Sequence, residues 1–185
     1  MSSLTDRPPP PGLVFRNWRS RDVEALCRYA NNKNIWLCLL DRFPHPYTRR
    51  DAERWIDLNN ATLSPPLNFA IELDGEAIGG VGLDRRQDVH RGTAEIGYWV
   101  AEPFWGRGIG TAAARFIADY AFRAYPLVRL EARVFEWNRA SARVLERAHF
   151  QLEARLRQAV TKEGRVGDAL LYARCRDDVP PVSPT

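Results

Sequence analysis

The sequence predicts a mixed α/β fold, in which helices cover the faces of one sheet. Short segments of alternating apolar and polar residues predict strands, and longer segments with apolar residues three and four positions apart predict helices. Their order along the chain is β-α-α-β-β-β-α-β-α-β-β. A chain of 185 residues with a hydrophobic fraction of 45% is long and apolar enough for one domain with its own core.

Both ends of the chain are predicted to lie outside that domain. Pro8 to Pro11 cannot continue a helix or a sheet ladder, and the closing residues 179–185 are also rich in proline. We therefore expect a flexible tail over residues 1–12, a single folded domain over residues 13–175, and a second flexible tail over residues 176–185.

The domain is expected to open with a strand and two helices. Leu13 to Trp18 is predicted to be the strand, and the hydroxyl of Ser20 is expected to cap a helix that ends near Ala30. The second helix is expected to begin after Thr48, because Asp51 stands three residues on, as in a capping box.

Three strands follow the second helix. Asp74-Gly75 is a strong turn signal, so the segments on either side of it, Phe69 to Leu73 and Ala77 to Leu83, are predicted to form a hairpin. Thr93 to Val100 is predicted to be the third strand. Its apolar residues are nearly continuous, which is typical of a strand at the centre of a sheet.

Helices and strands alternate over the rest of the domain. The remaining elements are predicted in chain order as a helix from Thr111 to Tyr125, a strand from Arg129 to Phe135, a helix from Asn138 to Ala148, and strands from Leu152 to Gln158 and from Ala169 to Arg174. Pro126 ends the first of these helices, and Lys162-Glu163-Gly164 turns the chain between the last two strands.

Composition excludes several classes of protein. The net charge of +4 and the pI of 9.2 suit an anionic ligand, but they are too small to indicate nucleic acid. Arginine supplies 25 of the 27 basic residues, for which genomic base composition is the simplest explanation. The three cysteines have no zinc or redox spacing. Without a secretory signal or an apolar stretch long enough to span a bilayer, we expect a cytoplasmic protein with free thiols and no membrane partner.

A glycine-rich loop lies between the third strand and the helix that follows it. Gly106, Gly108 and Gly110 can adopt backbone angles that other residues avoid, so that successive N–H groups can point at one spot. The start of the helix adds partial positive charge, and Arg107 adds a full one. Together they are suited to a pyrophosphate, although an ordinary tight connection would also explain the glycines. The spacing fits neither a Rossmann nor a Walker loop.

The loop and several other segments resemble the GNAT acetyltransferases, in particular the ribosomal-protein N-acetyltransferase-like (RimJ/RimL) branch. The matching segments are Phe104-Trp105-Gly106-Arg107-Gly108, Gly108-Ile109-Gly110, His45-Pro46-Tyr47-Thr48, the helix Asn138 to Glu146 with its N-x-x-S-x-x-V-L-E pattern, and the later Asp168 and Tyr172. The chain departs from the pattern at His149, which replaces a glycine before Phe150. The resemblance covers nearly the whole predicted domain.

The resemblance implies a GNAT fold, whose mostly antiparallel sheet splays at its centre, and acetyl-CoA as co-substrate without a metal. The pantetheine arm would lie between the strand ending at Val100 and the strand beginning near Arg129. A backbone N–H near Val100 would polarise the thioester carbonyl. The implied cofactor-binding residues are Trp99, Val100 and Ala101 for the arm, Gly106, Arg107, Gly108, Ile109, Gly110 and Thr111 for the pyrophosphate, and Asn138 for the arm or for the splayed strand.

The resemblance also implies catalytic residues. Glu95 is the candidate base, acting directly or through water, although a salt-bridged strand carboxylate is an equal interpretation. The family's usual acid, a tyrosine, is replaced by Leu145, so Ser141 is the candidate proton donor to the leaving thiolate, the alternative being a plain hydroxyl in the first turn of a helix. Trp36 and Tyr98 are candidates for the acceptor pocket, with core packing as the alternative.

The function expected from these residues is N-acetyl transfer from acetyl-CoA to a primary amine, by direct attack in a ternary complex. The amine would belong to a protein N-terminus or to a small molecule. Two alternatives stay open: another donor such as succinyl-CoA, and an acyl-CoA-binding module without turnover. His45, His90 and His149 have no metal spacing. Because dimers are frequent in similar proteins, a homodimer is also open.

Overall fold

The computed structural model describes residues 8–61 and 65–178, which form one seven-stranded sheet in the order β1-β2-β3-β4-β5-β7-β6. The strands are β1 (Leu13–Arg16), β2 (Asn68–Leu73), β3 (Glu76–Arg85), β4 (Thr93–Val100), β5 (Arg129–Phe135), β6 (Gln151–Lys162) and β7 (Arg165–Cys175). All neighbouring strands are antiparallel except β4 and β5. The predicted central place of β4 is confirmed. Residues 1–7 and 179–185 of the predicted tails lie outside the described residues.

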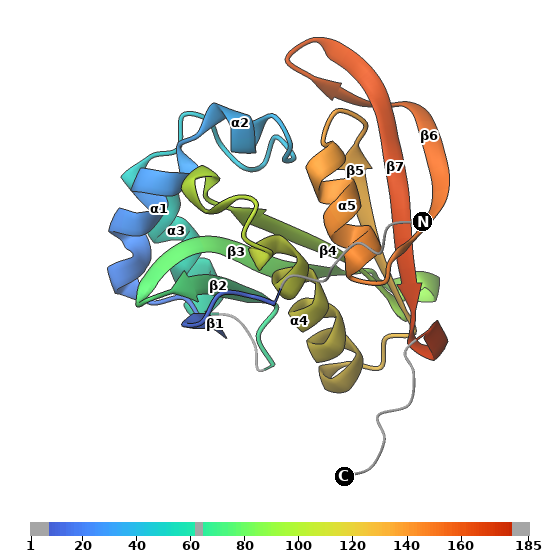
Figure 1. The fold of residues 1–185 in the computed structure, drawn as a ribbon, viewed down its shortest axis with the longest axis horizontal. Coiled ribbons are helices and arrows are strands. Elements are labelled where there is room, and N and C mark those ends of the chain that lie inside the picture. Colours follow the sequence, from blue (N-terminus) through green and yellow to red (C-terminus); the bar gives the residue numbers. More distant parts are fainter. Residues whose placement is uncertain (1–7, 62–64, 179–185) are drawn as a thin grey trace.

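Helices cover both faces of the sheet, as predicted (Figure 1). The helices are α1 (Val23–Ala30), α2 (Lys33–Trp36) and α3 (Arg49–Asn60) on one side, and α4 (Ile109–Ala124) and α5 (Arg139–Arg147) on the other. Each side has its own group of buried apolar residues. Trp18, Leu26 and Ile56 belong to the group beneath α1 and α3, whereas Ile117, Leu130 and Leu145 belong to the larger group beneath α4 and α5. The predicted order is confirmed, and the structure adds the single-turn helix α2 and short 3₁₀ turns.

One predicted helix cap is confirmed and another is wrong. The Thr48 hydroxyl accepts a hydrogen bond from the Asp51 N–H, and the Asp51 carboxylate accepts one from the Thr48 N–H, which completes the capping box of α3. Ser20 does not cap α1. It lies inside a 3₁₀ turn, and the Asp22 carboxylate accepts the Arg19 N–H at 2.8 Å instead. Asp22 also pairs with the buried Arg16 at 2.7 Å and occupies the N-cap position of α1, whose first turn has no side-chain cap.

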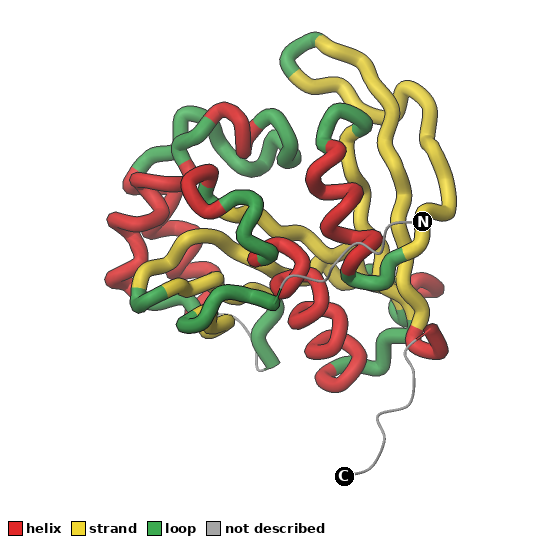
Figure 2. Tube along the Cα trace, in the orientation of Figure 1, coloured by secondary structure: helices red, strands yellow, loops and turns green. Residues whose placement is uncertain are grey.

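The last hairpin is longer than predicted. Strands β6 and β7 remain paired from Gln151 to the turn that follows Lys162, whereas β5 pairs with β7 only as far as Ala169. The hairpin therefore extends beyond the rest of the sheet as an arm (Figure 2). The register shifts between Leu156 and Val160, where Gln158 has a φ of 52°. This irregularity breaks the two-residue alternation, which is why the pattern predicted a shorter strand.

Candidate cofactor and acceptor site

The two central strands part from each other, as the resemblance implied. Strands β4 and β5 pair at only three positions, the last of which joins Glu95 to Glu131. Beyond this point β4 stays paired with β3 up to Val100, and β5 stays paired with β7 up to Phe135. In Figure 1, β4 runs toward the side of α1 and α2 while β5, β7 and β6 rise away from it. The facing edges of β4 and β5 are therefore unpaired with each other in their second halves.

The backbone of β4 turns Val100 toward this parting. The Ala101 N–H donates to the Ile78 carbonyl of β3 at 2.8 Å. Because hydrogen-bonding direction alternates along an antiparallel strand, Trp99 also faces β3, whereas Tyr98 and Val100 face away from it. Three residues, Trp99, Val100 and Ala101, were expected to hold the pantetheine arm of the cofactor. Of these, only Val100 presents its N–H to the parting. Its carbonyl accepts a hydrogen bond from the Trp105 indole at 2.6 Å.

The glycine-rich loop gives α4 an N-terminus without a side-chain cap. Gly106 and Gly108 have φ angles of 75° and 81°, which favour glycine, and Gly108 is the N-cap residue. The helix begins at Ile109, two residues earlier than predicted. The N–H groups in the first turn of a helix have no partner within the helix. No side chain caps α4, so the first-turn amides up to Thr111 have no capping side chain as a partner.

Gly110 has a different role from the other two glycines. It lies inside α4, and the structure gives it no positive φ, contrary to our expectation. A Cβ at Gly110 would lie 3.2 Å from a methyl carbon of Val144 in α5. The missing side chain therefore lets α4 and α5 approach closely beside the loop. Arg107 is exposed and lies over the Phe104 ring at 5.2 Å, so its charge is next to the loop.

Ser141 and Asn138 meet the parting from the start of α5. Asn138 caps the helix, because its side-chain oxygen accepts the Ser141 N–H at 3.1 Å. The Ser141 hydroxyl shares a hydrogen bond of 2.8 Å with the Tyr98 phenol of β4. Burial raises the pKa of Tyr98, so the phenol keeps its proton. The fully buried Leu145 leaves no acid at the family's usual position.

The partnership of Tyr98 with Ser141 was not predicted from the sequence. The structure places Tyr98 on the α5 side of the sheet, and its expected contact with the acceptor stays a prediction. Trp99 lies on the opposite side, packed against Phe43 with ring centroids 5.9 Å apart. Strict alternation along a strand is the signal that could have separated these neighbours.

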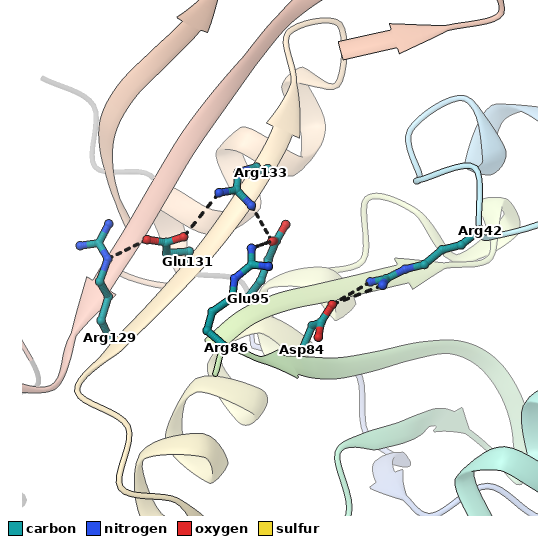
Figure 3. Close-up of polar contacts among 7 residues, drawn as sticks. All are labelled: Arg42, Asp84, Arg86, Glu95, Arg129, Glu131 and Arg133. Atoms are coloured by element: carbon teal, nitrogen blue, oxygen red, sulfur yellow. Dashed lines mark hydrogen bonds and ion pairs between the residues drawn. The ribbon is translucent and has the colours of Figure 1, made fainter. Parts of the chain in front are cut away.

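Glu95 lies at the closed end of the parting, between two arginines (Figure 3). Its Oε2 atom is 2.5 Å from a nitrogen of Arg86 and 2.7 Å from a nitrogen of Arg133. Arg133 also lies 3.8 Å from Glu131, the residue paired with Glu95 across the two strands. The salt-bridged arrangement is therefore present. Both arginines contact the same oxygen, which leaves Oε1 as the one that could receive a proton.

Trp36 is largely covered by other side chains. The ammonium nitrogen of Lys162 lies 3.7 Å from the centroid of its ring, and His45 stacks on it at 5.3 Å. Lys162 is only 4% exposed and donates to the Leu39 carbonyl at 3.0 Å and to the Asp41 carboxylate at 2.7 Å. This role of Lys162 was not predicted from the sequence, although it is one of only two lysines in an arginine-rich chain.

Residues 37–43, which we call the strap, contact the strands on both sides of the parting. On the β4 side of the parting, Phe43 packs against Trp99. On the β5 side of the parting, the Trp137 indole donates to the Leu37 carbonyl at 3.0 Å, and Lys162 contacts the strap from the β6–β7 hairpin. The strap therefore spans the open end of the parting on the side of α1 and α3.

The described residues were expected to hold no metal site, no membrane span and no disulfide. Within residues 8–61 and 65–178, no group of His, Cys, Asp and Glu side chains could hold a metal ion. No helix in the described part of the chain is long and apolar enough to cross a membrane. The three cysteines form no disulfide.

Comparison with known proteins gives consistent matches over most of the chain. A family model described as an acetyltransferase (GNAT) domain matches residues 12–151. The putative ribosomal N-acetyltransferase YdaF of Bacillus subtilis is 37% identical over 171 residues, which cover 87% of this chain and 90% of that protein. RimJ of Mycobacterium smegmatis in complex with CoA-disulfide is 28% identical, with a TM-score of 0.80 over 91% of this chain and 84% of that one. RimL in complex with coenzyme A is 24% identical, with a TM-score of 0.79 over 94% and 99% of the two chains.

Proposed function

The chain belongs to the acetyltransferase (GNAT) family, in its RimJ/RimL-like branch, and from this premise we propose how its own residues transfer an acetyl group from acetyl-CoA to a primary amine. One observation carries the proposal. The Val100 N–H faces the parting of β4 and β5, and the uncapped N-terminus of α4 follows on the same strand-to-helix connection. Thioester and pyrophosphate would thus each have donors within one segment, residues 98–111.

The pyrophosphate would bind at the start of α4. The amides from Gly106 to Thr111, together with the positive end of the helix and the charge of Arg107, suit a doubly charged anion. The pantetheine arm would lie between β4 and β5 and use the groups of Tyr98 and Val100 that face the parting. The Val100 carbonyl is occupied by Trp105, whose side chain is 48% exposed. The Val100 N–H is therefore the group available to the thioester carbonyl.

The reaction is attack of a neutral amine nitrogen on the thioester carbonyl carbon. The carbonyl oxygen becomes an oxyanion, which the Val100 N–H stabilises by about 3 kcal/mol. The carbon–sulfur bond then breaks, the nitrogen loses a proton, and the thiolate gains one to leave as CoA. Ser141 is the proposed donor to sulfur. Tyr98 shares a hydrogen bond with Ser141 and holds its hydroxyl at the parting.

Glu95 is the proposed acceptor of the amine proton, through water. Val100 comes five residues after Glu95, which at about 3.3 Å per residue is roughly 17 Å along β4. A glutamate side chain cannot span that distance to a nitrogen at the thioester. We therefore propose a chain of water molecules between the amine and Oε1 of Glu95, and we favour the water-mediated alternative over direct proton transfer.

A remote base favours an acceptor of low pKa. An α-amino group has a pKa of about 8 and a lysine side chain one of about 10.4, so the α-amine is far more often neutral at physiological pH. The relative that is 37% identical is named a putative ribosomal N-acetyltransferase, which points to a protein acceptor for that relative. We therefore propose a protein N-terminal amine as the acceptor, and small amines as the alternative.

Release of CoA thiol tests the proposal. Purified protein would be given acetyl-CoA with a panel of amines comprising short peptides with free N-termini, free amino acids and linear polyamines. We expect turnover with at least one peptide, and slower turnover when succinyl-CoA replaces acetyl-CoA. Calorimetric binding of CoA without acetylation of any amine would instead indicate an acyl-CoA-binding module. Absence of CoA binding would overturn the site itself.

A further inference from the structure

Strand β4 carries a glycine on the side from which the acceptor would approach. Gly97 lies between Glu95 and Trp99, and these three residues point to the same side because side chains alternate along a strand. That side faces α1 and α3. A Cβ at Gly80, the residue paired with Trp99, would touch the side chains of Trp99 and Trp18, and Trp18 belongs to the group of buried residues beneath α1 and α3.

The fold does not require glycine at position 97. Its φ is not in the positive range, so other residues can adopt its backbone conformation. Among the residues that the structure describes, a Cβ at Gly97 would meet no heavy atom within 4 Å, and the residue is exposed. The sheet's other glycines differ. A Cβ at Gly79 would lie 2.3 Å from the Trp99 carbonyl, and one at Gly82 would lie 1.9 Å from the Asn68 side chain.

Gly97 lies where the sheet surface has no side chain, next to the carboxamide of Asn68. It is paired with Gly82 across β3 and β4, so neither strand raises a side chain at this position. The Asn68 side chain covers Gly82 from β2 and puts a carboxamide next to the bare surface. Glycine in a strand is often found where a ligand or another backbone approaches closely.

The neighbouring positions on the same side are occupied. Toward the closed end, Glu95 is held by Arg86 and Arg133. Toward the open end, Trp99 is packed against Phe43 of the strap. Lys162 connects the strap to the β6–β7 hairpin through its hydrogen bond to the Leu39 carbonyl. Gly97 is therefore the position on this side of β4 where an incoming chain meets no side chain.

We propose that Gly97 is a specificity-determining residue, over which the chain that bears the acceptor amine passes on its way to Val100. This inference rests on the proposed function and adds the route and class of the acceptor. Val100 comes three residues after Gly97, a distance of roughly 10 Å along the strand. That length matches about three extended residues, so the site suits an amine at the end of a slender, extended chain, such as the first residues of a peptide.

Side chains added at position 97 test the inference. The variants Gly97→Ala and Gly97→Val fill the bare surface in two steps, and alanine and valine are both compatible with a strand. Thr93→Val is the matched control, because Thr93 lies on the same side of β4, four residues back, where β4 is still paired with β5. The acceptor is the most active amine of the panel described above, and CoA affinity is measured by calorimetry for every variant.

We expect Gly97→Val to raise the acceptor KM by about tenfold or more, with a smaller rise for Gly97→Ala, because added methyl groups in a fitted site have effects of this order. The affinity for CoA and the kinetics of the Thr93→Val variant should stay within about twofold of the wild type. An unchanged acceptor KM in a folded Gly97→Val variant would overturn the inference, as would loss of CoA binding in that variant. Failure of the wild-type protein to acetylate any amine would instead overturn the proposed function, and with it this route.

Discussion

The buried ammonium of Lys162 is expected to hold the strap in place. The side chain is only 3% exposed, lies over the Trp36 ring and donates to the Leu39 carbonyl. Lys162→Met keeps most of the apolar stem but removes the charge. The strap would then lose its hydrogen-bonded contact with the β6–β7 hairpin, and the Leu39 carbonyl would lose its donor.

The size of the effect follows from these contacts. A hydrogen bond from a charged donor contributes about 1.5 kcal/mol or more, and a cation over an aromatic ring about 1 kcal/mol. The pair with Asp41 adds little, because the Asp41 side chain is 77% exposed and water screens it. Methionine also avoids the cost of burying an ammonium. We therefore expect a net loss of about 2 kcal/mol in the free energy of unfolding.

Urea unfolding measures this loss directly. The midpoint should fall with little change in slope, and the melting temperature should fall by about 4–8 °C for a chain of this size. Lys33→Met is the matched control. Lys33 joins the same hairpin turn through Glu163, but both side chains are about half exposed, so its loss should stay below about 1 kcal/mol. Equal stability of the Lys162→Met and Lys33→Met variants would refute the reasoning.

Three further substitutions test the proposed chemistry and the packing beside it. Glu95→Gln should lower kcat about tenfold at neutral pH and less at pH 9, because more of the amine is neutral at pH 9 without the help of a base. The control variant Glu131→Gln should not show this pH dependence. Equal losses of kcat at both pH values in Glu95→Gln would exclude a base role. Ser141→Ala should lower kcat by about tenfold or more with an unchanged KM for acetyl-CoA, and a normal kcat would remove Ser141 as the proton donor. Gly110→Val should push α4 from α5 and lower stability by about 1–3 kcal/mol, so wild-type stability would contradict the close contact with Val144.

Local patterns predicted much of the fold. The bounds of β4 and β5 agree with the prediction to the residue, because the apolar or alternating pattern of β4 begins after Gly92 and that of β5 ends before Glu136. The capping box of Thr48 is likewise a contact between residues three apart. Ser20 failed as a cap because the chain forms a 3₁₀ turn over Ser20–Asp22, so that α1 begins only at Val23, with Asp22 at its N-cap position. A pattern of residue types does not show where such a turn delays the start of a helix.

The site was harder to predict than the fold, since it depends on long-range contacts. The parting of β4 from β5 followed from the resemblance, because periodicity describes single strands and not their pairing. The contact of Lys162 with the strap joins residues more than a hundred positions apart. Tyr98 and Ser141 come from different elements as well, so neither pattern showed that they would meet. The glycine pair at Gly82 and Gly97 is visible only once the register of β3 and β4 is known.

Hydrogen–deuterium exchange with and without CoA tests the central claim most directly, because it reports on backbone amides. We predict that CoA slows exchange in peptides covering Tyr98 to Thr111, where the amides of Val100 and of the first turn of α4 would bind the ligand. Peptides from β1 and β2, which lie far from the parting in the sheet order, should exchange as before. Unchanged exchange over Tyr98 to Thr111 at saturating CoA would contradict the account.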